Sequence, residues 1–155
     1  MAFFSASRCS HRRKLRGKGM QIIKCTVSDV SLLAEMNKRL IEDERSSNTM
    51  SLDELKDRMS GFINGEYDAF FFKEDEAVVG YALVRQTVSP LYLRQFYIER
   101  EYRRRHLGKE AFEILLDFLK VNSIDIDVLP WNEGGRKFWK RMGFSETCIS
   151  MNFRR

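Results

Sequence analysis

The chain has 155 residues, of which 43% are hydrophobic and 32% are charged, a composition typical of one compact globular domain. No apolar run approaches the ~18–20 residues that span a bilayer. The three cysteines and two histidines lie at spacings that argue against a disulfide framework and a zinc site, so we expect reduced thiols, a cytoplasmic location and no metal.

The net charge of +5 comes from the first 19 residues, which hold six basic side chains and no acidic one. The rest of the chain holds 21 of the 27 basic side chains against 22 acidic ones, so its charge does not favour a nucleic-acid partner. We expect residues 1–19 to form a disordered basic segment. Its origin stays open between a cloning leader or upstream translated stretch, an organelle-targeting peptide, and an arm that contacts RNA or anionic lipid.

Residues 20–155 read as a single domain that begins with a strand at 21–26 and a helix ending near residue 43. Ser51 and Glu54 have the spacing of a capping box, which predicts that a second helix begins there. Aromatic and β-branched residues then predict three strands, at 67–73, 77–88 and 91–98, the first two forming a hairpin.

Apolar residues recur at helical spacing from 108 to 121, which predicts an amphipathic helix. A strand at 124–129, a short helix at 134–142 and one or two final strands within 144–153 complete the chain. This order of elements indicates an α/β (α+β) fold, in which helices cover both faces of a mixed sheet.

A cationic loop links the strand at 91–98 to the helix that follows it. The unpaired N–H groups and positive dipole end of a helix N-terminus attract anions. Here basic side chains add to that charge, and a glycine permits close approach of a ligand to the backbone. The loop suits a pyrophosphate, and its residues are Arg103, Arg104, Arg105, His106, Leu107, Gly108 and Lys109.

A second distinctive segment follows the next strand and reads N-E-G-G-R-K-F-W-K-R-M-G-F from Asn132 to Phe144. Taken alone it is a capped helix, in which Asn132 caps the start, Phe138 and Trp139 enter the core, and Gly143 stops the helix. Helix capping does not explain why this segment follows the cationic loop at a distance of one strand.

Together the two segments resemble the motifs of the GNAT acetyltransferase superfamily, usually written Q/R-x-x-G-x-G/A and N-x-x-A-x-x-F-Y-x-x-x-G-F, and the resemblance covers residues 20–155. It implies a mostly antiparallel central sheet of about six to seven strands, splayed between the fourth and fifth. It also implies transfer of an acetyl group from acetyl-CoA to a primary amine by direct attack on the thioester. The alternative is a non-catalytic module that binds acyl-CoA.

The resemblance assigns cofactor contacts to particular positions. The backbone of Phe96, Tyr97 and Ile98 would hold the pantetheine arm like an added strand. The backbone from Arg104 through Leu107 to Lys109 would hold the pyrophosphate, and the side chains of Arg103–Arg105 or Lys109 would reach the ribose phosphate. Asn132 would bond the pantetheine, with Phe138 and Trp139 packed beside the cofactor.

Two departures from the family pattern stand out. His106 takes the place of a glycine, so its side chain must fit a restricted backbone conformation; it would either weaken phosphate contact or, when protonated, add to it. Trp139 takes the place of the tyrosine that protonates the departing thiolate in relatives, and an indole N–H is not a usable acid.

The fourth strand lacks the glutamate that serves many relatives as a base. Gln95 would instead orient a water or the acceptor, and Tyr97 or Tyr92 is a candidate proton donor. We expect Glu99 to lie at the surface. Acidic residues in the first two helices would attract a cationic amine, although a solvated helix face is the simpler explanation. The family also implies a homodimer through the final strands.

Overall fold

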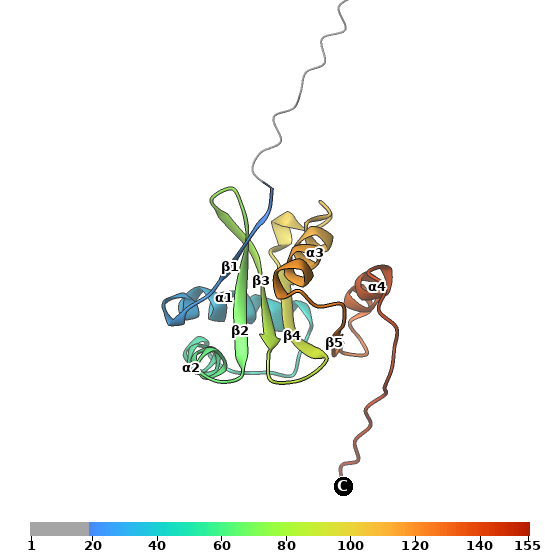
Figure 1. The fold of residues 1–155 in the computed structure, drawn as a ribbon. Helices are drawn as coiled ribbons and strands as arrows, with labels where there is room; N and C mark the ends of the chain where they lie inside the picture. Colours follow the sequence, from blue (N-terminus) through green and yellow to red (C-terminus); the bar gives the residue numbers. More distant parts are fainter. Residues whose placement is uncertain (1–18) are drawn as a thin grey trace, which may run out of the picture.

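The computed structural model describes residues 19–155, so the expectations for residues 1–18 lie outside it. The described part forms one sheet with helices on both faces (Figure 1). None of its helices has both the length and the apolar character that a membrane crossing requires. In chain order the elements are β1 (Gln21–Lys24), η1 (Val27–Asp29), α1 (Val30–Asp43), α2 (Leu52–Ile63), β2 (Tyr67–Glu74), β3 (Ala77–Arg85), β4 (Leu91–Ile98), η2 (Arg100–Tyr102), α3 (Leu107–Leu119), β5 (Ile124–Ile126) and α4 (Glu133–Arg141).

The sheet has the strand order β1-β2-β3-β4-β5. The first three neighbouring pairs are antiparallel, and β4 and β5 are parallel, as expected for a crossover through a helix. The predicted fold class is therefore confirmed, with a lower strand count. The predicted capping box is also present: the Glu54 N–H donates to Ser51 Oγ at 3.3 Å, and the Ser51 N–H donates to Glu54 Oε2 at 2.7 Å.

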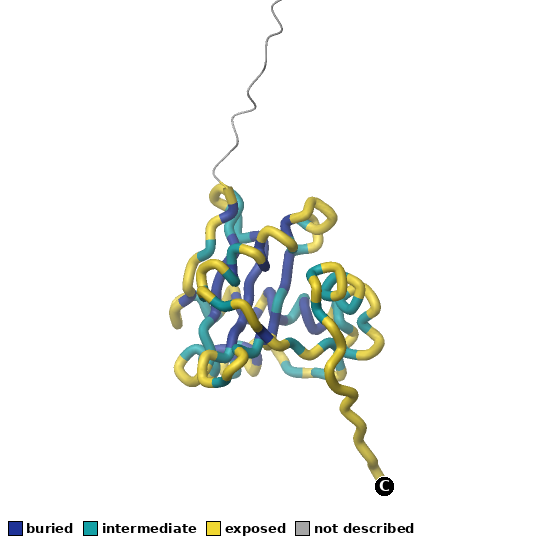
Figure 2. Tube along the Cα trace, turned by 45° about the vertical axis from the view of Figure 1, so that its right-hand side comes forward, coloured by how far each residue is buried: buried dark blue, intermediate teal, exposed yellow. Residues whose placement is uncertain are grey.

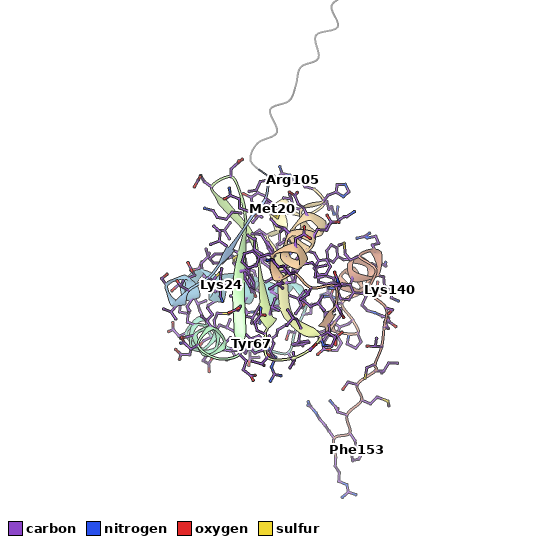
Figure 3. The ribbon with its side chains drawn as sticks, viewed as in Figure 1. Met20, Lys24, Tyr67, Arg105, Lys140 and Phe153 are labelled. Atoms are coloured by element: carbon purple, nitrogen blue, oxygen red, sulfur yellow. The ribbon has the colours of Figure 1, made fainter. Side chains whose placement is uncertain are left out.

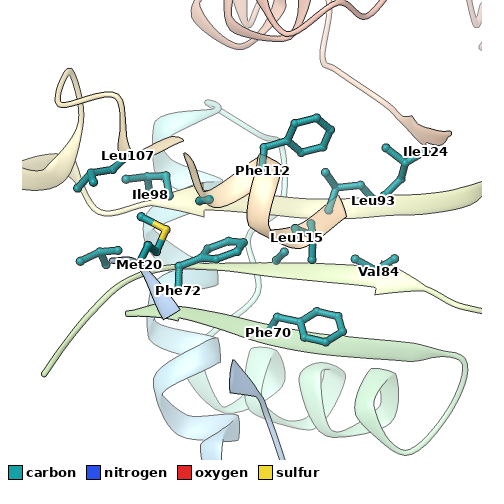
Figure 4. Close-up of a cluster of buried hydrophobic side chains, with 13 residues drawn as sticks. Met20, Phe70, Phe72, Val84, Leu93, Ile98, Leu107, Phe112, Leu115 and Ile124 are labelled. Atoms are coloured by element: carbon teal, nitrogen blue, oxygen red, sulfur yellow. The ribbon is translucent and has the colours of Figure 1, made fainter. Parts of the chain in front are cut away.

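Two apolar layers hold the helices against the sheet. On one face α3 packs through Ala111, Phe112 and Leu115 onto side chains that include Phe70 and Phe72 (Figure 4). On the other face α1 and α2 pack through residues such as Leu33, Met36 and Met59. Burying a side chain of this size contributes about 1.5–3 kcal/mol, and Figure 2 shows the buried positions running along the central strands.

The final strands predicted within residues 144–153 are absent, so the sheet formed by residues 19–155 has five strands rather than six or seven. After α4 the chain runs away from the domain as an extended exposed segment that ends beyond Phe153 (Figures 2 and 3). Its alternating apolar residues Ile149, Met151 and Phe153 are 85–90% exposed. The alternation is typical of a strand, but a strand also needs a neighbour for its backbone hydrogen bonds.

Candidate active site

The sheet opens between β4 and β5. The parallel pairing joins Leu91, Tyr92 and Leu93 to Ile124–Ile126 and stops there. The second half of β4, including Phe96, Tyr97 and Ile98, keeps its antiparallel pairing with β3 but has no strand on its other side within residues 19–155. This is the splay that the family resemblance implies, and it leaves a strand edge that an extended ligand can join.

The loop at the open end of β4 has the backbone of an anion site. Arg104 and His106 both adopt left-handed conformations, with φ of 62° and 61°. His106 is the N-cap of α3 and gives no side-chain hydrogen bond to the first turn, so the N–H groups there stay available. Turns of this kind and helix N-termini both concentrate N–H groups toward an anion.

Some basic side chains of this loop form ion pairs within the protein, and others are available to bind a phosphate. The Arg103 guanidinium pairs with Asp43, donates from Nε to the Ile98 carbonyl oxygen at 2.8 Å, and lies 5.2 Å from the Tyr97 ring centroid. Arg100 also pairs with Asp43, at 2.6 Å. Both arginines therefore fix the loop to α1, and the guanidinium of Arg103 already has partners.

Three cations remain for a phosphate. Arg104 has no ion-pair partner among residues 19–155, and Arg105 lies 5.8 Å from the Tyr102 ring centroid. Lys109 makes only an exposed contact of 3.7 Å with Glu113, of a kind that contributes little. In Figure 3 Arg105 marks this end of the molecule. The Leu107 side chain is buried, so that residue offers a ligand only its backbone.

A cluster of aromatic rings from β4, α3 and α4 lies next to the cationic loop. The Phe96 ring stacks on that of Phe138 at 6.2 Å and meets Trp139 edge to face at 5.2 Å. Trp139 also contacts Phe112 and Phe144, at 5.3 and 5.1 Å between centroids. Trp139 is thus a packing residue of an apolar cluster.

Gly108 and Asn132 help to place α4 beside these rings. A Cβ added to Gly108 would lie 3.2 Å from Cε2 of Phe138, so the glycine gives that ring its room. Asn132 Oδ1 accepts from the Gly135 N–H at 2.9 Å and caps α4. The cap predicted from the sequence is confirmed, and it leaves the Asn132 amide nitrogen as the group to offer a ligand.

Buried polar groups line the opposite face of β4, beneath α1. Gln95 is 9% exposed, and its Oε1 accepts a hydrogen bond from the Tyr81 hydroxyl at 3.0 Å. Asn37 on α1 is 2% exposed, and its Oδ1 has no hydrogen-bond partner within the described residues. Burial raises the pKa of Tyr81, and the Glu44 carboxylate contributes in the same direction while Arg58 opposes it.

Tyr97 and Glu99 form a second polar chain on this face. The Tyr97 hydroxyl donates to Glu99 Oε2 at 3.1 Å, and Arg39 Nη2 lies 2.6 Å from Glu99 Oε1. The Glu99 side chain is only 14% exposed, so the expectation of a surface position was wrong. Burial, followed by the charge and hydrogen bond of Glu99, raises the pKa of Tyr97 to about 12.

Glu44 ends α1 and is joined to the segment that follows β5. Its backbone oxygen accepts from the indole N–H of Trp131, which follows β5. Burial, and after it the charge of Asp43, raises the pKa of the Glu44 carboxyl. Burial alone would also raise the pKa of Asp43, but hydrogen bonds from Arg100 and Arg103 lower it. From the sequence Glu44 was only one acid among several; contacts distant along the chain distinguish it.

Comparisons with known proteins agree with this geometry. The model of the acetyltransferase (GNAT) family matches residues 33–144. An aminoglycoside N-acetyltransferase solved with CoA superimposes with a TM-score of 0.70 at 16% identity, covering 91% of this chain and 97% of that one. A ribosomal-protein-alanine N-acetyltransferase from Brucella melitensis gives 0.68 at 12%, covering 88% and 99%.

A further solved structure, described as a predicted acetyltransferase from Clostridium acetobutylicum and determined with acetyl-CoA, gives a TM-score of 0.67 at 19% identity, covering 87% and 96%. Structural likeness at these identities shows the fold. The family match spans most of the domain, including β4, the cationic loop and the whole of α4. The chain therefore belongs to the acetyltransferase (GNAT) family.

Proposed function

We propose that this protein transfers the acetyl group of acetyl-CoA to a primary amine. The observation that carries the proposal is the unpaired second half of β4 leading directly into the cationic N-terminus of α3. An extended amide-containing arm fits the strand edge, and a pyrophosphate fits the helix end. Acetyl-CoA has both features in one molecule.

The cofactor contacts follow from this placement. The backbone of Phe96–Ile98 would hold the pantetheine, and the backbone N–H groups from Arg104 to Lys109 would hold the pyrophosphate. The side chains of Arg104, Arg105 and Lys109 are available for the remaining phosphate, whereas Arg103 already binds Asp43 and Ile98. The Asn132 amide and the ring of Phe138 would contact the arm from α4.

In the reaction a neutral amine nitrogen attacks the thioester carbonyl carbon. The carbon–sulfur bond breaks, the CoA thiolate leaves and takes a proton, and the proton lost by the amine passes to a base. We favour Glu44 as the base, because it is partly buried at the end of α1, its charge acts on Tyr81, the hydrogen-bond partner of Gln95, and burial raises its pKa. Gln95 would orient the acceptor or a water.

Proton return to the thiolate has two routes in this proposal. Tyr97 lies on the β4 segment that would hold the arm, but its hydroxyl is committed to Glu99 and its pKa of about 12 makes it a weak acid. Water or the acid form of Glu44 is the other route. A backbone N–H of Tyr97 or Ile98 would stabilise the oxyanion.

The first test is ligand-dependent thermal unfolding with acetyl-CoA, CoA and ATP. A ligand that binds only the folded state adds about 2.7 kcal/mol at a hundredfold excess over its Kd. We expect acetyl-CoA and CoA, but not ATP, to raise the midpoint. Release of free CoA thiol in the presence of amines then measures transfer. Equal shifts with all three ligands, or none, would contradict the assigned site.

A non-catalytic acyl-CoA-binding module is the second candidate. It is favoured by Trp139, which packs among Phe96, Phe112 and Phe144 where relatives place a tyrosine acid. Acetyl-CoA binding without thiol release against a broad panel of amines would support this alternative.

A further inference from the structure

A β-bulge in β4 brings two polar side chains onto one face. Leu83 of β3 pairs with Gln95 and the next residue, Val84, pairs with Leu93, so Arg94 is an extra residue in β4. Leu93 packs on the α3 face, whereas Gln95 bonds Tyr81 on the face covered by α1 and α2. Arg94 shares this second face, because its guanidinium lies over aromatic rings of α2 and β2.

Arg94 and Arg58 form a pair around one aromatic ring. Their guanidinium carbons lie 5.0 and 5.2 Å from the Phe62 ring centroid. Arg94 also lies 5.8 Å from the Tyr67 centroid and donates from Nη1 to the Tyr67 hydroxyl at 3.4 Å. Figure 3 shows Tyr67 at the opposite end of the domain from Arg105, so this pair is separate from the phosphate loop.

No acidic side chain within residues 19–155 lies at ion-pair distance from either guanidinium. Arg39, Arg85, Arg100 and Arg103 each have a carboxylate partner. The Asp127 carboxylate, which lies on the same side, accepts a hydrogen bond from the Tyr92 hydroxyl at 2.9 Å. Burial, and then the charge of Arg94, lowers the pKa of the half-buried Arg58.

The pairing of β4 in the sheet shows where Arg94 lies relative to the expected path of acetyl-CoA. Leu93 is the last residue of β4 that pairs with β5, so Arg94 marks the point where the gap begins. A ligand anchored at Arg104 and lying along Phe96–Ile98 would reach toward this point with its far end. That end of acetyl-CoA carries the thioester. An acceptor held by Arg94 would therefore lie beside the reacting carbonyl.

We propose that Arg58 and Arg94 bind a carboxylate of the acceptor, so that the amine substrate is a small amino acid rather than a polyamine or a protein N-terminus. Guanidinium groups match carboxylates in a two-point geometry. The pair would hold the carboxylate while Glu44 receives the proton of the amine. The role of the carboxylate in substrate choice rests on the proposed acetyl transfer. Binding of a carboxylate by the two arginines does not depend on it.

The test compares the twenty common amino acids, β-alanine and γ-aminobutyrate with their carboxamides as acceptors. We expect kcat/KM for at least one acid to exceed that of its amide tenfold, although the amide has the less basic and hence more available amine. Arg94→Gln and Arg58→Gln should each lower kcat/KM for the acid about ten- to hundredfold. Both should leave the amide rate and the Kd of acetyl-CoA within twofold.

Two further variants test whether the preference for the acid depends on the guanidinium geometry of Arg94. Arg94→Lys keeps the charge without the two-point geometry, so it should restore part of the preference. Arg85→Gln is the matched control, because Arg85 lies at the same end of the sheet but already pairs with Glu66 at 2.7 Å. It should leave the preference for the acid unchanged.

Binding of the N-acetylated amino acids and of their amides, followed by thermal shift, separates the two proposals. An Arg94-dependent shift with the acid alone, in a protein that does not bind acetyl-CoA, would support the carboxylate site and overturn the transferase proposal. Acetylation of amines with no acid preferred to its amide would overturn the carboxylate site alone. So would an acid preference that survives both Arg58→Gln and Arg94→Gln.

Discussion

The indole N–H of Trp131 donates to the backbone oxygen of Glu44, with 3.0 Å between Nε1 and O. Trp131 follows β5, and Glu44 lies at the end of α1. The preceding residue, Asp43, binds Arg100 and Arg103 from the loop after β4. The end of α1 is therefore held from both sides of the gap in the sheet, which fixes the backbone of Glu44.

Glu44→Gln should lower kcat about 10²–10⁴-fold, the range that general base catalysis supplies, with the Kd of acetyl-CoA unchanged. Glutamine keeps the size of the side chain but cannot accept the proton. Steady-state thiol release and acetyl-CoA titration measure the two quantities. Glu35→Gln, on the exposed side of the same helix, is the control and should have no effect on either.

The pH profile gives an independent check on this carboxylate. Glu44 must be ionised to accept a proton, and its pKa is raised by burial and by Asp43. Activity should therefore fall as pH falls through a value above that of an ordinary glutamate. We expect that acidic limb in the wild-type kcat profile and its loss in Glu44→Gln. An identical limb in both proteins would assign the base elsewhere.

Gly108→Val should weaken acetyl-CoA binding at least tenfold while the domain stays folded. A Cβ at this position would already lie 3.2 and 3.4 Å from two atoms of the Phe138 ring, and valine adds two methyl groups. The ring would have to leave its stack on Phe96, and the approach to the α3 N-terminus would narrow. Calorimetric titration measures the affinity and circular dichroism the fold.

Gly61→Val is the matched control for that change. Gly61 lies on α2, and nothing lies within 4 Å of a Cβ placed there. It imposes the same change of residue type without touching the loop, so acetyl-CoA affinity should be unaltered. If Gly108→Val bound acetyl-CoA within twofold of wild type, the phosphate-loop assignment would be wrong.

Sequence patterns predicted the features whose causes are local. Ser51 and Glu54 lie three residues apart and make the predicted capping box, and the apolar spacing after Gly108 gave α3 nearly to its ends. The ion-pair partners of Glu99 and Arg103 come from α1, about 60 residues away, at Arg39 and Asp43. No spacing rule indicates such contacts, so the buried position of Glu99 and the engagement of Arg103 were missed.

His106→Gly should stabilise the domain by about 0.5–1 kcal/mol, which raises Tm by about 1–4 °C. His106 is exposed and has φ of 61°, where an ordinary side chain is strained and glycine is not. His106→Ala keeps the Cβ and should give no gain. Urea unfolding of the three proteins measures the difference, and a loss of stability in the glycine variant would mean that the imidazole makes stabilising contacts.

Deleting Thr147–Arg155 should convert a dimer to a monomer without lowering the stability of the domain. Ile149, Met151 and Phe153 alternate along an extended segment and contribute nothing to the core of one chain, being 85–90% exposed. The outer edge of β5 is free within residues 19–155, and an edge strand accepts another strand from a second copy. The deletion keeps Glu146, whose carboxylate pairs with Arg136 and Lys140 on α4 at 2.7 and 3.1 Å. Light scattering over a range of concentrations measures the assembly, and a full-length chain that stays monomeric throughout would refute the predicted homodimer.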